Sequence, residues 1–368
     1  MQVDYKARAD KLRELAGSKA DVVALVPGAN MVYFTGLHFH LSERPIIAMF
    51  NSDGDLAFII PELEMPKLHA RPDLEARAFM WSDKDGYEDA FRAAVTEMGL
   101  GGTTLGVDGM TMRVSEWLTF QQMDSSIKVQ PVERDLIAIR AIKSAFEVEA
   151  MRRAIKISEA ALDRVLDWVQ PGMTEREIAG KISQELIQGG CEGNAFEPLV
   201  QTGPNSAFPH GFLTERALLK DELLLIDYGG LVDGYPADIT RTFCLGTPTD
   251  EMRRMYDVVL RANQAATAAA GPGVAMGAVD KAARDVITQA GLGPYFIHRT
   301  GHGLGLDGHE PIPQIATGVD DLLEVGMSFT IEPGVYIPGL GGVRVEDNVV
   351  VTESGVDVLT SYPRQLTR

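Results

Sequence analysis

Residues 223–246 read LLLIDYGGLVDGYPADITRTFCLG and predict two β-strands joined by a turn. Residues 223–226 are apolar, three glycines follow, and residues 239–245 resume the strand. Asp227 ends the first strand and Asp238 lies within the second, both next to apolar residues. A carboxylate in such surroundings is costly unless a cation or hydrogen-bond donors meet it. Two of them facing each other across one hairpin indicate a metal site.

A second predicted hairpin repeats this arrangement. Residues 327–336 and 343–351 form its strands, and each strand carries one glutamate among apolar residues, Glu332 and Glu346. His302 comes between the two hairpins, in RTGHGLGLDGHE, where glycines let the backbone bend close to a ligand. We expect the four carboxylates and this imidazole to meet.

Two pairs of helices precede the two hairpins. Capping boxes at Ser144-x-x-Glu147 and Thr174-x-x-Glu177 open the first pair, and Thr249 opens the second. The predicted helices cover about residues 144–170, 174–188, 249–270 and 279–290. Because helix–helix–sheet occurs twice, we expect pseudo-twofold halves with helices outside and a shared sheet inside.

The rest of the chain predicts a smaller first domain, so the fold class is α+β. Residues 1–135 mix helices and strands, which is typical of a small α/β domain. Residues 136–144 are charged and helix-prone, and we interpret them as a linker before a second domain at 145–368. A chain of 368 residues is long enough for two cores.

Composition excludes several classes of function. A formal charge of −18 disfavours nucleic acid and anionic membrane as partners. The start lacks the apolar core of a signal peptide, and no apolar run approaches the roughly 20 residues of a membrane span. Two cysteines, Cys191 and Cys244, are too few for a disulfide framework. We expect a cytoplasmic protein.

Charge and donor type narrow the expected metal site. One divalent ion would leave −2 on four carboxylates and raise their pKa, whereas two ions neutralise them, so we expect a dinuclear centre. Oxygen donors and one imidazole, without thiolate, suit Mn²⁺ or Co²⁺ and are compatible with Zn²⁺ or Fe²⁺. Two such ions roughly 3.5–4 Å apart lower the pKa of a shared water toward ~7, which is hydrolytic chemistry. Taken singly, each strand carboxylate also fits a turn cap, an edge charge or half of an ion pair.

The motifs DYGGLVDGYPADITRTF, HRTGHGLG, IEPG and VRVED resemble, in order and spacing, the signature of metallopeptidases with the pita-bread fold. These are the proline-specific peptidases and the methionine aminopeptidases, and the resemblance covers about residues 145–368. It implies that Asp238 and Glu346 bridge two metals and that Glu332 acts as general base and acid. The implied metal ligands are Asp227, Asp238, His302, Glu332 and Glu346.

Two further motifs favour the proline-specific branch. QTGPNSAFPHG ends in His210 and GHEP contains His309, and both resemble the active-site histidines of that branch. The resemblance implies that one of them stabilises the oxyanion while the other orients the substrate. Tyr336 and Arg344 match positions that line the substrate pocket, and Arg344 is expected to brace Glu346 or the substrate.

The first domain favours the same branch. Prolidases, aminopeptidase P and creatinase have such a domain, whereas methionine aminopeptidases lack it. The resemblance implies a homodimer in which the first domain lends a loop to the neighbouring active site. His38, His40 and Arg44 are candidates for that loop, and a plain polar surface loop is the alternative.

One departure bears on the substrate. Some prolidases bind the dipeptide carboxylate with a basic residue four positions after the second histidine, where this chain has Pro313. The cation must then come from Arg344, Arg44 or Arg299. We expect an Xaa-Pro dipeptidase acting on small peptides. The alternatives are aminopeptidase P activity on longer peptides, a same-fold enzyme for non-peptide molecules, and a non-enzymatic peptide-binding module, which retention of all five ligands disfavours.

Overall fold

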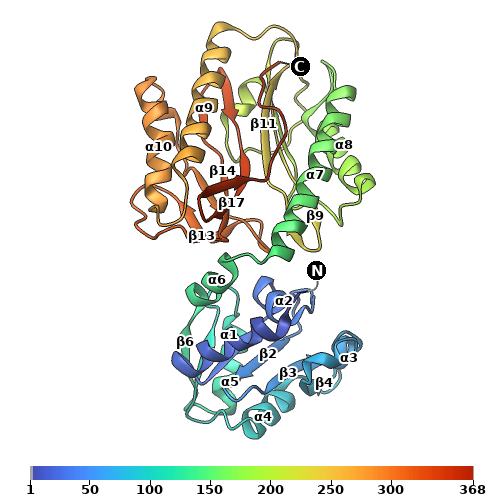
Figure 1. The fold of residues 1–368 in the computed structure, drawn as a ribbon. Coiled ribbons are helices and arrows are strands. Elements are labelled where there is room, and N and C mark those ends of the chain that lie inside the picture. Colours follow the sequence, from blue (N-terminus) through green and yellow to red (C-terminus); the bar gives the residue numbers. More distant parts are fainter. Residues whose placement is uncertain (1–2, 368) are drawn as a thin grey trace. The chain divides into compact units, whose positions relative to one another are not determined.

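The computed structural model describes residues 3–367 and divides the chain after Arg140 into two compact units, drawn in Figure 1. Each unit has its own hydrophobic core. No helix among the described residues is long and apolar enough to cross a membrane.

The first unit is a mixed sheet with the strand order β4-β3-β2-β1-β5-β6 and helices around it. Its strands are β1 (Val22–Leu25), β2 (Ile47–Asn51), β3 (Leu56–Pro61), β4 (Arg77–Trp81), β5 (Thr104–Val107) and β6 (Lys128–Pro131). Its helices are α1 (Tyr5–Ser18), α2 (Ala29–Thr35), α3 (Met65–His69), α4 (Glu88–Glu97), α5 (Val114–Met123) and α6 (Glu133–Ala141). β1 pairs antiparallel with β2 and parallel with β5.

Most of the expected linker is ordered secondary structure. α6 occupies its first part, and the division between the units falls after Arg140. The last part packs into the second unit, because the Lys143 backbone N–H donates to Gly326 O at 2.8 Å and its ammonium pairs with the buried Glu310 at 3.0 Å. A buried ammonium needs such an anion to offset its desolvation.

The second unit consists of two helix pairs and the strands between and after them. Its helices are α7 (Ala145–Trp168), α8 (Glu175–Gly189), α9 (Asp250–Ala269) and α10 (Met276–Gln289). Its strands are β7 (Leu199–Thr202), β8 (Leu223–Tyr228), β9 (Leu231–Val232), β10 (Tyr235–Pro236), β11 (Ile239–Cys244), β12 (Gly301–Gly303), β13 (Glu310–Ile315), β14 (Ser328–Ile331), β15 (Gly334–Ile337), β16 (Gly341–Arg344), β17 (Asp347–Thr352) and β18 (Gly355–Val358).

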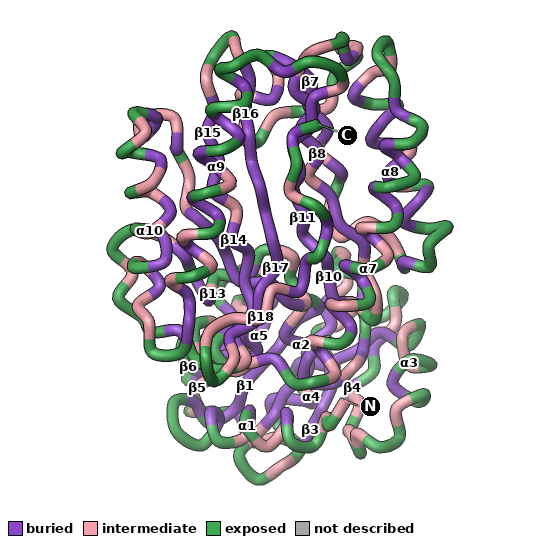
Figure 2. The backbone as a smooth tube through the Cα atoms, turned by 45° about the horizontal axis from the view of Figure 1, so that its top comes forward, coloured by how far each residue is buried: buried purple, intermediate pink, exposed green. Residues whose placement is uncertain are grey.

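The two halves of this unit follow the predicted helix–helix–sheet order. α7 packs on α8 and α9 on α10, and both predicted capping boxes are formed, at Ser144 and Thr174. The first half contributes the sheet β11-β8-β7 and the second the sheet β13-β12-β14-β17-β18. β8, β11, β14 and β17 are buried over most of their length (Figure 2). The expected shared sheet is therefore wrong in detail, since each half has a sheet of its own.

The first hairpin differs from its prediction at Asp238. This residue precedes β11 and does not lie within it, and its N–H donates to the Asn348 side chain at 3.0 Å. Gly229 lets the end of β8 pass close to the returning chain, because a Cβ there would lie 1.7 Å from Ala237 O. The Asp238 side chain thus starts from an irregular segment next to the second half.

The second hairpin is interrupted at both glutamates. β14 pairs with β17 and β15 pairs with β16, and Glu332 and Glu346 lie in the breaks between these pairs. Pro333 has no N–H to continue the ladder. The freed N–H groups bond elsewhere, Glu332 N to Thr300 O at 2.8 Å and Glu346 N to Thr240 O at 3.1 Å. The continuous strands predicted here are wrong, and the breaks aim both carboxylates at one place.

Arg241 joins the two halves from within the core. Its buried guanidinium donates to Asp347 Oδ1 at 2.9 Å, to Tyr362 O at 3.0 Å and to Glu346 O at 2.5 Å. Removing one partner of a buried ion pair is far more costly than removing an exposed one. The residue therefore fixes β11 against the segment that carries Glu346.

We expect Arg241→Ala to lower the free energy of unfolding of the second unit by about 3–5 kcal/mol, because it strands buried acceptors. Urea denaturation of the metal-free protein measures this loss. Arg152→Ala is the control, since Arg152 pairs with Asp357 at the surface and its loss should cost less than ~1 kcal/mol. Equal losses of stability in the two variants would contradict the role of Arg241 as a buried link between the two halves.

Candidate functional site

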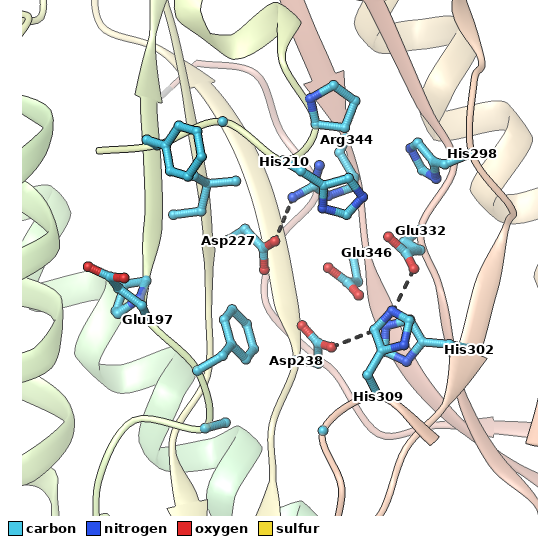
Figure 3. Close-up of a pocket in the computed structure, with 18 of the residues that line it drawn as sticks. Glu197, His210, Asp227, Asp238, His298, His302, His309, Glu332, Arg344 and Glu346 are labelled. Atoms are coloured by element: carbon cyan, nitrogen blue, oxygen red, sulfur yellow. Dashed lines mark hydrogen bonds and ion pairs between the residues drawn. The ribbon is translucent and has the colours of Figure 1, made fainter. Parts of the chain in front are cut away.

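A cavity of about 940 Å³ opens in the second unit, and all five predicted metal ligands line it. Figure 3 shows Asp238 and Glu346 between Asp227 on one side and His302 and Glu332 on the other. Both halves contribute, because β8 and the segment before β11 carry the aspartates while β12 and the two hairpin breaks carry the others. The basic and imidazole side chains in the same wall are Arg176, His210, His298, Arg299, His309 and Arg344.

The ligand atoms converge within a few ångströms. His302 Nε2 lies 3.5 Å from Asp238 Oδ2 and 3.5 Å from Glu332 Oε1. One ligand atom from each of Asp238, His302 and Glu346 lies within 4.8 Å of the other two. All three of these residues are buried, so water does not screen them well.

His302 presents a lone pair to these carboxylates. Its Nδ1 lies 3.0 Å from Gly303 O and donates to it, which leaves Nε2 as an acceptor. Burial, and then the neighbouring His309, lower the pKa of His302 to about 3, so the ring is neutral. An acceptor nitrogen thus faces acceptor oxygens, and only a cation or added protons make that arrangement favourable.

The pKa values and hydrogen bonds of the carboxylates also indicate that the site lacks positive charge. Burial raises the pKa of Asp227, and it raises the pKa of Glu332 to about 7. Burial and mutual repulsion raise the pKa of Asp238 and of Glu346 well above the ordinary range. Asp227 Oδ1 is buried and accepts no hydrogen bond. An oxygen-rich, donor-poor cluster of this kind fits divalent cations.

Arg344 offsets part of this negative charge, so the net charge of the site differs from the −4 expected for four carboxylates alone. Its Nη2 donates to Asp227 Oδ2 at 2.6 Å, and its Nε donates to Thr240 Oγ1 at 2.9 Å. Thr240 in turn donates to Glu346 Oε2 at 2.5 Å. Arg344 therefore braces Asp227 directly and Glu346 through Thr240. With this guanidinium the net charge of the cluster is −3, so charge alone no longer favours two divalent ions over one. The argument for two ions is then the position of the remaining metal ligands, which lie on both sides of Asp238 and Glu346.

Tyr336 lies behind the cavity wall and does not line it. Its hydroxyl accepts from Arg344 Nη1 at 2.9 Å and lies 2.9 Å from His298 Nε2, to which it donates. His298 Nδ1 lies 2.7 Å from Arg299 O. Burial lowers the pKa of His298 to about 4, so it accepts from the hydroxyl. Tyr336 is not among the described residues of the cavity wall, and its hydroxyl holds Arg344 and His298. Its contact with a substrate stays a prediction.

The two predicted active-site histidines both face the cavity. The His309 ring stacks on the His302 ring with a centroid distance of 3.7 Å. Arg299 Nη2 lies 2.9 Å from the Nδ1 atom of His309. Burial and Arg299 lower the pKa of His309. His210 lies on the exposed loop that follows β7 and reaches the same cavity (Figure 3).

The predicted N-terminal loop belongs to the first unit. His38 and His40 are exposed there, and the Arg44 guanidinium is bound by both oxygens of Asp83, at 2.9 and 2.7 Å. The contribution of this loop to a neighbouring active site stays a prediction.

Sequence reasoning missed Asp280, which supports the His302 segment. This fully buried carboxylate accepts from Thr300 N at 3.1 Å, Thr300 Oγ1 at 2.7 Å and Thr317 Oγ1 at 2.6 Å. In the sequence Asp280 and Arg284 are four residues apart on a predicted helix. Such an acid–base pair usually lies on the exposed face of a helix. No local pattern could have shown that Asp280 faces the metal-site segment.

Comparison with known proteins places the chain in a family. Residues 149–353 match metallopeptidase family M24, and residues 8–142 match the creatinase/prolidase N-terminal domain. The Xaa-Pro dipeptidase of Pyrococcus furiosus is 34% identical over 98% of this chain and 99% of its own length. Two solved structures match nearly throughout. They are a dipeptidase from Pyrococcus horikoshii OT3 (TM-score 0.92, 38% identity, 98% of this chain and 99% of that one) and a prolidase from Thermococcus sibiricus (TM-score 0.94, 33% identity, 100% of both).

Both family matches, the likeness along the whole chain and the clustering of the five ligand residues show that this chain belongs to the pita-bread metallopeptidases of family M24 and carries the N-terminal domain of the creatinase/prolidase group.

Proposed function

We propose that this protein hydrolyses the Xaa-Pro bond of short peptides, and of dipeptides above all. One observation carries the proposal: five acceptor groups, three buried and two half-buried, converge on a cavity without enough hydrogen-bond donors to satisfy them, in a chain that matches an Xaa-Pro dipeptidase along nearly its whole length. Such a site is suited to binding divalent cations, and bound divalent cations support hydrolysis.

Asp227, Asp238, His302, Glu332 and Glu346 would hold two divalent ions, with Asp238 and Glu346 shared between them. The four carboxylates and one imidazole favour Mn²⁺ and are compatible with Co²⁺, Zn²⁺ or Fe²⁺. When bound, such ions supply Lewis acidity for the scissile carbonyl and lower the pKa of water.

The side chains around the cluster suit the remaining tasks of peptide hydrolysis. Glu332, whose pKa burial raises to about 7, can hold or release a proton near neutral pH and would pass one to the proline nitrogen. His210 and His309 face the cavity, where donors are needed for the negative charge that develops on the carbonyl oxygen.

Arg299 is the cation best placed for the carboxylate of a dipeptide. Arg344 is engaged by Asp227, and Arg44 is engaged by Asp83. Arg176 also lines the cavity, but its guanidinium pairs with Glu215 at 2.6 Å. Arg299 lines the cavity and forms no ion pair with any carboxylate of residues 3–367. Its Nη2 lies against the His309 ring, so the guanidinium and the ring stand together at the cavity wall.

Aminopeptidase P activity on longer Xaa-Pro peptides is the second candidate. Pro313 in place of a basic residue favours it, because a peptide that continues past proline has no carboxylate to bind at that point. Rates on Ala-Pro, Ala-Pro-Ala-Ala and a non-peptide amide, each with Mn²⁺, separate the three remaining reactions. Fastest cleavage of Ala-Pro supports the dipeptidase, and no cleavage of either peptide would overturn the proposal.

A cytoplasmic homodimer is part of the proposal. Cys191 and Cys244 are buried free thiols, as suits a reducing compartment. The first unit is the segment that we expect to form the dimer, and sedimentation of the purified protein tests this.

Removing a shared ligand should abolish metal binding together with activity. We expect Glu346→Ala to lose bound metal, measured by mass spectrometry of the dialysed protein, and to lose Ala-Pro hydrolysis. His309→Ala should keep its metal while turnover falls by about 10²–10³, the cost of one oxyanion donor. A Glu346→Ala protein that cleaves Ala-Pro at the parent rate would refute this arrangement.

Replacing Arg299 should affect only substrates with a free C-terminal carboxylate. We expect Arg299→Met to raise KM for Ala-Pro by about 30-fold or more, since truncating one partner of a charge pair that the bound dipeptide would bury costs about 2–5 kcal/mol. Hydrolysis of Ala-Pro-amide, which lacks that carboxylate, should change little. An equal loss on both substrates would assign Arg299 a different role.

The metal-free protein should lose stability as pH rises. Burial raises the Glu332 pKa to about 7, so between pH ~4.3 and ~7 the folded state binds more protons than the unfolded state. Glu332 therefore lowers stability by about 1–3 kcal/mol across that window and contributes no further change above it. Asp238 and Glu346, whose pKa values are also raised, add to the fall. Urea midpoints of EDTA-treated protein at pH 5 and pH 8 measure the fall, Glu332→Gln should reduce it, and a rise in stability with pH would contradict it.

A further inference from the structure

The loop at residues 203–214 holds His210 at the edge of the cavity. The tip, residues 208–212, has little anchorage of its own, since Phe208, His210 and Phe212 are exposed. The nearest anchor on the incoming side is the buried Ser206, whose Oγ accepts from Gly342 N at 2.8 Å. The hydrogen bonds near the tip are short-range, such as Gly211 N to Phe208 O at 3.0 Å. The position of the imidazole therefore depends on how the two ends of this loop are fixed.

Both ends of the loop are tied to one carboxylate, Glu175. On the incoming side its Oε1 accepts from Thr202 N at 2.8 Å, Thr202 Oγ1 at 3.1 Å and Asn205 Nδ2 at 2.9 Å. On the outgoing side its Oε2 accepts from Thr214 N at 3.1 Å and Thr214 Oγ1 at 2.6 Å. Glu175 thus closes the loop as a staple across residues 202–214.

The burial of Glu175 is hard to explain by stability alone. The residue is fully buried at the first position of α8, and no lysine or arginine among the described residues forms an ion pair with it. Five hydrogen bonds and the helix N-terminus stabilise its charge instead. A buried carboxylate without a counter-ion is a costly way to pack a helix end, so a specific geometric task accounts for it better.

We propose that Glu175 is the positioning residue for His210, and that it acts on the reaction only by holding the two ends of the His210 loop together. The proposal rests on the function proposed above. Glu175 does not line the cavity and touches no predicted metal ligand, so its effect must pass through the loop.

The charge and both oxygens of Glu175 are required for this task. In Glu175→Gln one oxygen becomes an N–H₂ group, which would face the N–H donors of either Thr202 or Thr214. One end of the loop then detaches while the volume of the side chain is unchanged. A reacting group displaced by about 1 Å can cost about 10²-fold in rate.

A double-mutant cycle on Ala-Pro hydrolysis tests the proposal. We expect Glu175→Gln to lower kcat by about 10- to 100-fold in the parent protein but by less than about twofold in a His210→Ala background. Metal content should stay at the parent level in all variants. Glu177→Gln is the matched control, because it lies on the same helical turn, binds only Thr174 and should leave kcat unchanged.

Two results overturn the proposal: full kcat in Glu175→Gln, or the same fold-loss with and without His210. If Glu175→Gln fails to fold, Thr214→Val removes the shorter of the two outgoing hydrogen bonds and keeps the one from Thr214 N, so it should give a smaller kcat loss with the same dependence on His210.

Hydrogen exchange of the metal-free protein separates this proposal from the proposed function. We expect faster exchange across residues 202–214 in Glu175→Gln than in the parent or in Glu177→Gln, whatever the substrate. Unchanged exchange would overturn the staple even in an active peptidase. Faster exchange in a protein that cleaves no Xaa-Pro peptide would instead overturn the function and leave the staple in place.

Discussion

The concentration of negative charge where the two halves meet is the constraint on which the second unit depends. Four carboxylates and one imidazole lone pair face a common volume, and Arg344 is the one guanidinium that contacts this cluster directly among the described residues. No packing of apolar side chains could make this arrangement stable, because the desolvation of each carboxylate opposes it. The architecture around the site therefore serves to hold mutually repelling groups in place until cations bind them.

Asp238, Glu332 and Glu346 are each aimed by an interruption of a strand, whereas Asp227 lies in the regularly paired β8. Pro333 breaks the second hairpin and frees the Glu332 region from the ladder, and Asp238 precedes its strand. Behind them a chain of hydrogen bonds runs from Arg344 through Tyr336 to His298. Because Arg344 can only donate, the direction of every proton in that chain is fixed. A site held in this way needs little rearrangement when a substrate binds.

The sequence predicted site residues that are unusual in their local surroundings. It did not predict contacts between residues far apart in the chain. Asp227 and Glu346 stand out because apolar residues surround them, and all five predicted ligands line one cavity. The capping boxes are equally local and were predicted correctly. Arg344 on Asp227 and Asp280 on Thr300 join residues 117 and 20 positions apart, and no spacing rule connects them. The break at Glu332 could have been predicted from Pro333, since proline cannot continue a ladder.

The division of the donors between the halves bears on how such a centre could arise. The first half supplies two aspartates, and the second supplies two glutamates and the histidine. Neither half alone encloses the volume that the donors face. If the halves descend from one ancestral segment, that segment would have needed to pair with a copy of itself before it could bind metal tightly. Gene duplication and fusion would then have freed each copy to change independently, so that an imidazole could enter one side only.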